Sequence, residues 1–194
     1  MNGFTYPIIM KRNVTAIVFD CSDTRCPRAF RQFLRKELGL EIGRDYQQTM
    51  VMGGAAALAH GPLSKAHQKE SVTDFYFMVN QAKRLVKNNR GPDGKTTIKR
   101  FIFLGHQDCH YYLEVTEHPD PKEERVAADL RRAAEEISRI LNMPEIRVEA
   151  YFGRFTDASM TKLTFDDLMT RSTPKSGLRH RLTIPLSRLR RMFP

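Results

Sequence analysis

The chain has 194 residues, of which 41% are hydrophobic and 28% charged, and its formal net charge is +10. This is the composition of an ordinary folded domain, and no apolar stretch reaches the roughly 20 residues that a membrane-spanning helix needs. Three cysteines are too few for the disulfide framework of a small secreted protein. Because residues 1–13 also lack the pattern of a secretory signal, we expect a cytoplasmic protein whose thiols are free to bind metal.

The first part of the chain predicts two strands with a helix between them. Residues 14–19 form a continuous apolar run, which is typical of a strand buried on both faces. Pro27 suits the first turn of a helix, and apolar residues then recur at helical spacing until Gly39. A second strand is expected over residues 47–52, where two glycines follow.

The second part of the chain continues the alternation of strands and helices. An amphipathic helix is expected over residues 71–87, a strand over 100–104, a helix over 123–141 and a strand over 145–152. Strands that alternate with helices predict an α/β fold with a mainly parallel central sheet flanked by helices. We expect residues 1–170 to form this single α/β domain.

Most of the excess positive charge lies in a basic C-terminal extension, residues 171–194. This extension holds seven of the 32 Lys and Arg and none of the 22 Asp and Glu, which leaves a net charge of +3 elsewhere. Such a segment can bind phosphate backbones or other anionic surfaces. It can also solubilise the protein or wrap around a subunit. We favour this second interpretation over nucleic-acid binding, because no aromatic residues interleave with the basic ones.

Two short motifs follow the ends of predicted strands. One is Cys-Ser-Asp-Thr-Arg at residues 21–25, and the other is Gly-His-Gln-Asp-Cys at residues 105–109. The carboxyl ends of parallel strands share the sheet edge at which α/β proteins bind ligands. Cys21, His106 and Cys109 would supply two thiolates and one imidazole there, a donor set that suits Zn²⁺ and leaves a fourth position for water or a carboxylate. The sequence therefore predicts a catalytic zinc site rather than a purely structural one.

A carboxylate and a guanidinium complete the first motif. Arg25 lies two residues beyond Asp23 and can hold its carboxylate through two parallel hydrogen bonds. Asp23 can instead bind zinc as the fourth ligand of a closed site. If it pairs with Arg25, it can accept a hydrogen bond from zinc-bound water, whose pKa zinc lowers from 15.7 to about 7. Arg25 is then the switch that holds Asp23 away from the metal.

The two motifs together resemble those of the β-class carbonic anhydrases. In that family Cys, His and Cys hold the zinc, and an Asp–Arg dyad follows the first Cys at the offsets seen here. The resemblance implies that Cys21, His106 and Cys109 are the zinc ligands and that Asp23 and Arg25 form the catalytic dyad. It also implies an α/β fold around a mainly parallel sheet, assembled as a homodimer or a larger homo-oligomer.

The same resemblance implies an activity and a substrate site. It predicts a zinc-dependent lyase that hydrates carbon dioxide to bicarbonate through zinc-bound hydroxide. Asp23 would orient this hydroxide while Arg25 holds Asp23. Gly53, Gly54 and Ala55 fall where the family has an Arg-Asn-Ala-Gly loop beside its pocket, and we expect them to contact the substrate.

Two other functions stay open at the level of sequence. A related zinc hydrolase on the same scaffold would act on carbon disulfide or carbonyl sulfide, with substrate access setting the difference. A non-catalytic, zinc-stabilised protein would bind an anionic partner through the basic extension.

Two individual residues also have alternative interpretations. His110, where the family has glycine, is a proton shuttle or, as we favour, a surface or packing residue, and Cys26 is expected to be structural.

Overall fold

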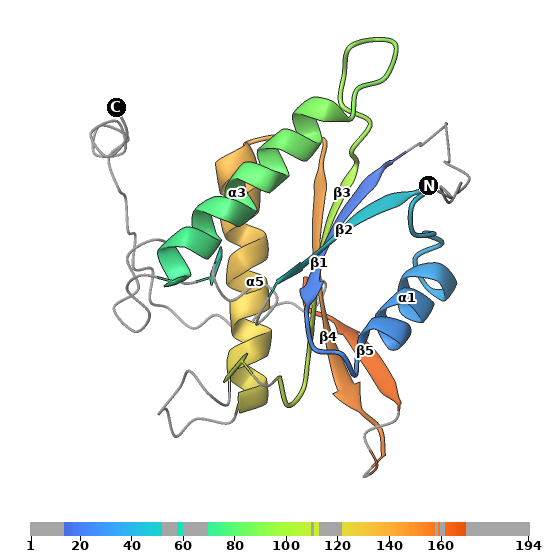
Figure 1. Ribbon diagram of the computed structural model, residues 1–194, viewed down its shortest axis with the longest axis vertical. Coiled ribbons are helices and arrows are strands. Elements are labelled where there is room, and N and C mark those ends of the chain that lie inside the picture. The colour runs from blue at the N-terminus through green and yellow to red at the C-terminus, as the bar shows by residue number, and fades with distance from the viewer. Residues whose placement is uncertain are drawn as a thin grey trace, which may run out of the picture.

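A central sheet of five strands organises the computed structural model (Figure 1). The structure describes residues 14–51, 58–59, 70–109, 111–112, 122–157, 159 and 162–169. Its strands are β1 (Ala16–Cys21), β2 (Tyr46–Val51), β3 (Arg100–His106), β4 (Arg147–Phe155) and β5 (Leu163–Asp167). Its helices of more than one turn are α1 (Pro27–Lys36), α3 (Glu70–Asn88) and α5 (Lys122–Leu141).

The strand order is β2-β1-β3-β4-β5, and every pair is parallel except β4 with β5. This confirms the predicted α/β fold with a mainly parallel sheet. The antiparallel edge strand β5 is an addition that the sequence pattern did not predict. Its five residues, Leu-Thr-Phe-Asp-Asp, are too short and too polar to stand out as a strand, and pairing with β4 defines them.

Helices cover both faces of the sheet. Figure 1 shows α3 and α5 together on one face and α1 on the other. Parallel neighbours need long crossover connections, and these helices lie in the connections. All six residues of β1 and the last six of β3 are buried, as expected of central strands that have a helix layer on each side. Among the described helices, none has the length and hydropathy needed to cross a membrane.

The two central strands run slightly past the apolar runs that predicted them. β1 ends at Cys21 and β3 ends at His106, so both residues are strand termini. Asp20 of β1 lies opposite Leu104 of β3 in the parallel register. The two strands therefore end at the same edge of the sheet, where the metal-capable side chains were expected to meet.

Helix α1 begins directly after the first motif. Pro27 is its first residue, and Cys26 precedes it as the N-cap without a side-chain hydrogen bond to the helix. Phe30 and Leu34 are buried against the sheet. The helix ends three residues before Gly39, whose φ of +67° is a left-handed conformation that glycine adopts easily.

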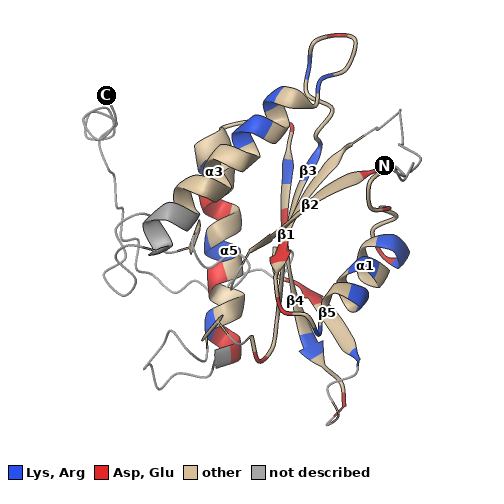
Figure 2. Ribbon diagram, viewed as in Figure 1, with Lys and Arg blue, Asp and Glu red and all other residues tan. Residues whose placement is uncertain are grey.

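The outer surface of α1 is strongly basic. Figure 2 shows Lys and Arg along this helix, and Arg28, Arg31, Arg35 and Lys36 are all exposed. The helix contains no acidic residue, whereas α5 mixes both signs of charge. Positive charge is therefore concentrated on α1 as well as in the extension 171–194. That extension, together with Gly53, Gly54, Ala55 and His110, lies outside the described residues, so predictions about them stay predictions.

Candidate metal centre

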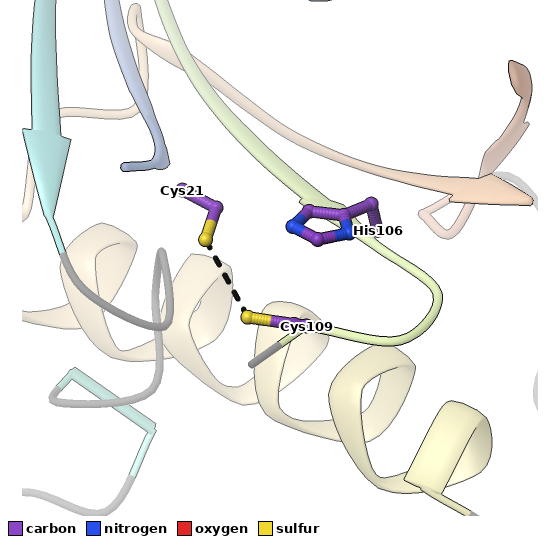
Figure 3. Close-up of side chains that lie close together, drawn as sticks. All are labelled: Cys21, His106 and Cys109. Carbon is purple, nitrogen blue, oxygen red and sulfur yellow. Dashed lines mark hydrogen bonds between the residues drawn. The ribbon is translucent and has the colours of Figure 1, made fainter. Parts of the chain in front are cut away.

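The carboxyl edge of the sheet brings Cys21, His106 and Cys109 together (Figure 3). Their nearest ligand atoms all lie within 4.8 Å of one another, and all three residues are buried. The Sγ atoms of Cys21 and Cys109 are 3.4 Å apart, and both cysteines are free thiols. Residues 88 positions apart in sequence thus form one compact cluster of soft donor atoms.

A tight turn carries the chain from His106 to Cys109. The backbone N–H of Gln107 donates to the carbonyl of Gly153 on β4, at 2.8 Å. Asp108 then adopts a φ of +57°, a left-handed conformation that aspartate tolerates better than most residues. This reversal lets Cys109 face back toward Cys21.

Gly105 allows Leu130 of α5 to pack closely behind the turn. A Cβ atom added at this position would lie 2.8 Å from Cδ1 of Leu130 on α5. Because real Cβ contacts are not this short, the Leu130 side chain would have to shift to admit any side chain at residue 105. The glycine of the second motif therefore has a packing role next to the cluster.

The orientation of His106 leaves one ring nitrogen available to a ligand. Its Nδ1 lies 2.7 Å from the carbonyl oxygen of Gln107, and since a carbonyl can only accept, Nδ1 carries the proton and donates it. Its Nε2 is buried and has no hydrogen-bond partner among the described residues. An imidazole fixed through Nδ1–H, with Nε2 facing thiols, has the orientation typical of a metal-ligating histidine.

This donor set fits zinc. Two thiolates, each about 2.3 Å from a tetrahedral Zn²⁺, lie roughly 3.8 Å apart. The observed sulfur separation of 3.4 Å is close to that value. Two thiolates and an imidazole bind Zn²⁺ in preference to Mg²⁺ or Ca²⁺. Within the described part of the chain, no other group of three or more metal-capable side chains converges in this way.

The two thiols share one proton when no metal holds them. A hydrogen bond from Cys109, with further help from His106, lowers the pKa of Cys21 to about 5. The pKa of Cys109 is raised, first because its thiol donates that hydrogen bond and then because it is buried. The backbone N–H groups of Tyr111 and Tyr112 act in the opposite direction and favour the Cys109 thiolate.

His106 is protonated in the same metal-free state. Burial alone would lower its pKa, but interactions with the thiols of Cys21 and Cys26 outweigh burial and raise the pKa to about 10. A Cys21 thiolate therefore lies beside an imidazolium. Cys26, which we expected to be structural, is fully buried at the start of α1 and outside the three-residue cluster.

The carboxylate of Asp23 is held by Arg25 beside this cluster. Its Oδ2 accepts from Nη2 of Arg25 at 2.7 Å, and the guanidinium Nε lies 3.1 and 3.2 Å from its two oxygens. The backbone N–H of Arg25 adds a fourth contact, 2.9 Å from Oδ1. These hydrogen bonds from Arg25 lower the pKa of Asp23 to about 2 despite its partial burial, so the carboxylate is ionised at neutral pH.

The dyad borders the metal-capable cluster directly. Oδ2 of Asp23 lies 3.7 Å from Nε2 of His106, and the Asp23 side chain is only 9% exposed. The structure therefore brings all five motif residues together, and it has Asp23 in the state paired with Arg25. That the three ligand candidates bind zinc stays a prediction.

Sequence reasoning missed Asp108 and Phe155. Asp108 accepts hydrogen bonds from Arg25 through both its side chain and its backbone carbonyl. Phe155, the last residue of β4, lies with its ring centroid 5.9 Å from Cζ of Arg25 and 6.5 Å from that of the His106 ring. The position of Asp108 between two expected ligands was a usable signal, but no pattern marked Phe155.

The turn that follows His106 is anchored from two sides. The Gln107 side chain accepts from the backbone N–H of Phe155 at 3.0 Å and donates to Glu123 of α5. Glu123 also accepts from Arg154 of β4, with Nη1 2.6 Å from Oε2. Gln107 thus fixes the turn to β4 and α5, and with it the carbonyl that orients His106.

Several solved carbonic anhydrases are similar to this chain. Tetrameric β-carbonic anhydrases from the filamentous ascomycete Sordaria macrospora align over 80% of this chain and 81% of theirs, with 15% identity and a TM-score of 0.37. Carbonic anhydrase from Streptococcus mutans aligns over 85% and 87%, with 15% identity and a TM-score of 0.43. The β-carbonic anhydrase of Aspergillus fumigatus aligns over 84% and 78%, with 13% identity and a TM-score of 0.40.

Comparisons by sequence find no match. No protein-family profile matches the chain, and no curated protein matches it. The three alignments with solved structures have TM-scores below 0.5 and identities of 13 to 15%. We therefore base the function proposed below on the geometry and chemistry of the site itself.

Proposed function

We propose that the protein is a zinc-dependent carbonic anhydrase that hydrates carbon dioxide to bicarbonate. The observation that carries this proposal is the relation of Asp23 to the three-residue cluster. A structural zinc site is closed by four protein ligands, whereas a catalytic site has three and keeps one position open. Here three donors converge, and the nearby carboxylate of Asp23 is held by Arg25 instead.

The residues of the cluster have distinct tasks in this proposal. Cys21, His106 and Cys109 would hold Zn²⁺, which when bound lowers the pKa of a coordinated water to about 7. The backbone N–H groups of Tyr111 and Tyr112 stabilise negative charge on Cys109. The carbonyl of Gln107 keeps the proton of His106 on Nδ1, so that Nε2 faces the site.

Asp23 acts on the reacting water as a hydrogen-bond acceptor. With a pKa of about 2 it carries no proton to give at neutral pH, so it is no general acid there. Its Oδ2 faces His106 Nε2 at 3.7 Å and can accept a hydrogen bond from a water in the site. Arg25 keeps this oxygen oriented through the short contact from Nη2.

The apolar surroundings of His106 suit an uncharged substrate. The rings of Phe30 and Phe155 lie 6.1 and 6.5 Å from the imidazole, measured between ring centroids. The imidazole therefore has aromatic neighbours on two elements, α1 and β4, and apolar surroundings favour a small apolar molecule over a strongly hydrated one. Carbon dioxide meets this requirement.

We also infer that the protein assembles as a homo-oligomer. Met50, on the edge strand β2, is 58% exposed, and Ile42, which precedes that strand, is 52% exposed. Within the described residues the outer edge of β2 has no partner strand, and exposed apolar side chains beside such an edge are typical of a surface that another chain covers. Light scattering on the purified protein tests this inference, and a monomer at all concentrations would contradict it.

The activity is tested by stopped-flow hydration of carbon dioxide between about pH 6 and pH 9. We expect the zinc-loaded protein to accelerate hydration and Cys109→Ser to lose zinc and activity together. No acceleration at any pH by fully zinc-loaded protein would contradict the proposal. Hydrolysis of carbon disulfide or carbonyl sulfide by that same inactive sample would favour the related hydrolase instead.

A further inference from the structure

Arg25 makes contacts that its pairing with Asp23 does not require. Its Nη1 lies 3.3 Å from Oδ2 of Asp108, and its Nη2 donates to the Asp108 carbonyl at 2.8 Å. Asp108 lies in the turn between His106 and Cys109. We propose that Asp108 is a positioning residue that holds Arg25 in the orientation in which Arg25 keeps the Asp23 carboxylate away from the metal. This inference rests on the proposed function of the site.

The guanidinium is held from both sides. Nε and Nη2 face Asp23, while Nη1 and Nη2 face Asp108. The Arg25 side chain is 41% exposed, and a single exposed ion pair restrains a long, flexible side chain only weakly. A second carboxylate, a carbonyl and the Phe155 ring on further sides restrict its orientation more strongly.

This arrangement connects the two halves of the site. Asp23 and Arg25 follow β1, whereas Asp108 follows β3 and lies between two of the expected ligands. Arg25 is therefore the physical link between the turn that carries Cys109 and the carboxylate beside His106. Displacement of that turn would alter the hold on Asp23, because the same guanidinium contacts both.

Arg25 and a bound metal compete for the Asp23 carboxylate. A carboxylate that accepts several hydrogen bonds from a guanidinium has fewer lone pairs to offer a metal ion. When Asp108 no longer restrains Arg25, the guanidinium can leave Asp23, and Asp23 can then approach the metal. Asp108 thus shifts the balance toward the open site without itself contacting substrate.

The backbone conformation of Asp108 determines which substitutions leave the turn intact. Its φ of +57° is accessible to Asn and Gly but strained for most other residues. Asp108→Gly removes the side-chain contact and relieves strain, while the backbone carbonyl remains. Asp108→Asn keeps a neutral oxygen that can still accept from Arg25. If Asp108 served only to shape the turn, both variants would behave as the wild type does.

The first test uses metal-free protein with ¹⁵N-labelled arginine and measures exchange of the Arg25 Nε–H with water. We expect exchange to be about 5-fold faster in Asp108→Gly, at the lower end of typical coupling between sites, and intermediate in Asp108→Asn. Glu136→Gln is the matched control, because Glu136 pairs with Arg139 in another exposed ion pair on α5, and it should leave Arg25 unchanged. Unchanged Arg25 exchange in Asp108→Gly would overturn the inference.

The second test uses Co²⁺-substituted protein and measures thiocyanate affinity from the visible spectrum. We expect Asp108→Gly to bind thiocyanate about 5-fold more weakly, because Asp23 then competes for the same position. In an Asp23→Asn background the same substitution should have no effect. An equal loss in that background would overturn the inference. If both tests succeed while wild-type protein fails to hydrate carbon dioxide, the proposed function falls and the role of Asp108 stands.

Discussion

The Asp23 carboxylate accepts three hydrogen bonds from the Nε and Nη2 atoms of Arg25, the shortest with Nη2 2.7 Å from Oδ2. This pairing is central to the proposed function, since Oδ2 is also the atom that lies 3.7 Å from Nε2 of His106. A carboxylate in that place can either close a metal site or leave it open to water. The geometry of the pair corresponds to the open alternative.

Arg25→Ala should separate metal binding from activity. Without the guanidinium, Asp23 is free to bind the metal, so hydration should fall by about 10²-fold or more, the scale of losing one preorganised electrostatic group. Zinc content should stay near normal, because none of the three ligand candidates is altered. Rate and zinc content are measured on the same sample, with Arg25→Lys as a charge-preserving comparison that lacks the planar fork. Loss of zinc in Arg25→Ala would refute the switch.

The three-residue cluster predicts which cysteines contribute to zinc binding. Cys109→Ser should weaken zinc binding by at least about 100-fold. Loss of a residue that only hydrogen-bonds to a metal ligand already weakens binding by up to about 100-fold, and Cys109 is itself an expected ligand. Cys26→Ala is the matched control, since Cys26 is equally buried and its thiol faces His106 from outside the cluster. Competition with a chromogenic chelator measures both affinities. Equal losses in the two variants would show that the ligand set is wrong.

Zinc binding should release about two protons per chain at pH 7.5. The pKa of His106 is raised to about 10 and that of Cys109 is raised, so both are protonated, whereas Cys21, with a pKa of about 5, is already a thiolate. A metal requires all three in the deprotonated form. Affinity should therefore rise as pH rises from neutrality toward the pKa of His106. Calorimetry of zinc binding in buffers of different ionisation enthalpy counts the released protons. A binding enthalpy that does not depend on the buffer would contradict proton release.

A buried ion pair away from the site should make stability depend on pH. Glu149 is 2% exposed and accepts from Arg100 at 2.7 and 2.8 Å and from the Tyr151 hydroxyl at 2.7 Å. Burial would raise the pKa of Glu149, but these hydrogen bonds outweigh burial and lower it below the usual 4.5. The resulting stabilisation is complete above about pH 4.5 and is lost as pH falls through the lowered folded-state pKa.

Glu149→Gln should accordingly reduce the free energy of unfolding at pH 7 by about 2 kcal/mol, the scale of leaving a charged group unpaired. The difference from wild type should shrink below about pH 4.5, as the pH falls toward the lowered folded-state pKa of the wild-type carboxyl. Urea unfolding at both pH values measures it. A difference that stays constant with pH would mean that the charge of Glu149 does not stabilise the fold.

Much of the fold could be predicted because it depends on local pattern. Both long helices fall within one residue of their predicted ends, since an apolar stripe at helical spacing marks them. The motif residues could be placed at one sheet edge because parallel strands end together. β5 could not be predicted, since its pairing with β4 rather than its own composition makes it a strand.

The surroundings of the dyad escaped prediction for a similar reason. Phe155 and Asp108 lie 130 and 83 positions from Arg25 in sequence, and only the folded chain brings them beside its guanidinium. The positive φ of Asp108 is also a property of the turn, with no distinct sequence signal in a residue other than glycine. Contacts between distant segments are set by tertiary packing.

The most direct measurement is X-ray absorption at the zinc edge of the purified, zinc-loaded protein. The structure places the two sulfurs of Cys21 and Cys109 beside His106 Nε2, with Cys26 outside the cluster. We predict one zinc per chain with two sulfur and two nitrogen or oxygen ligands. A third sulfur ligand would identify a closed structural site that recruits Cys26, and that result, or the absence of bound zinc, would contradict a catalytic metal centre here.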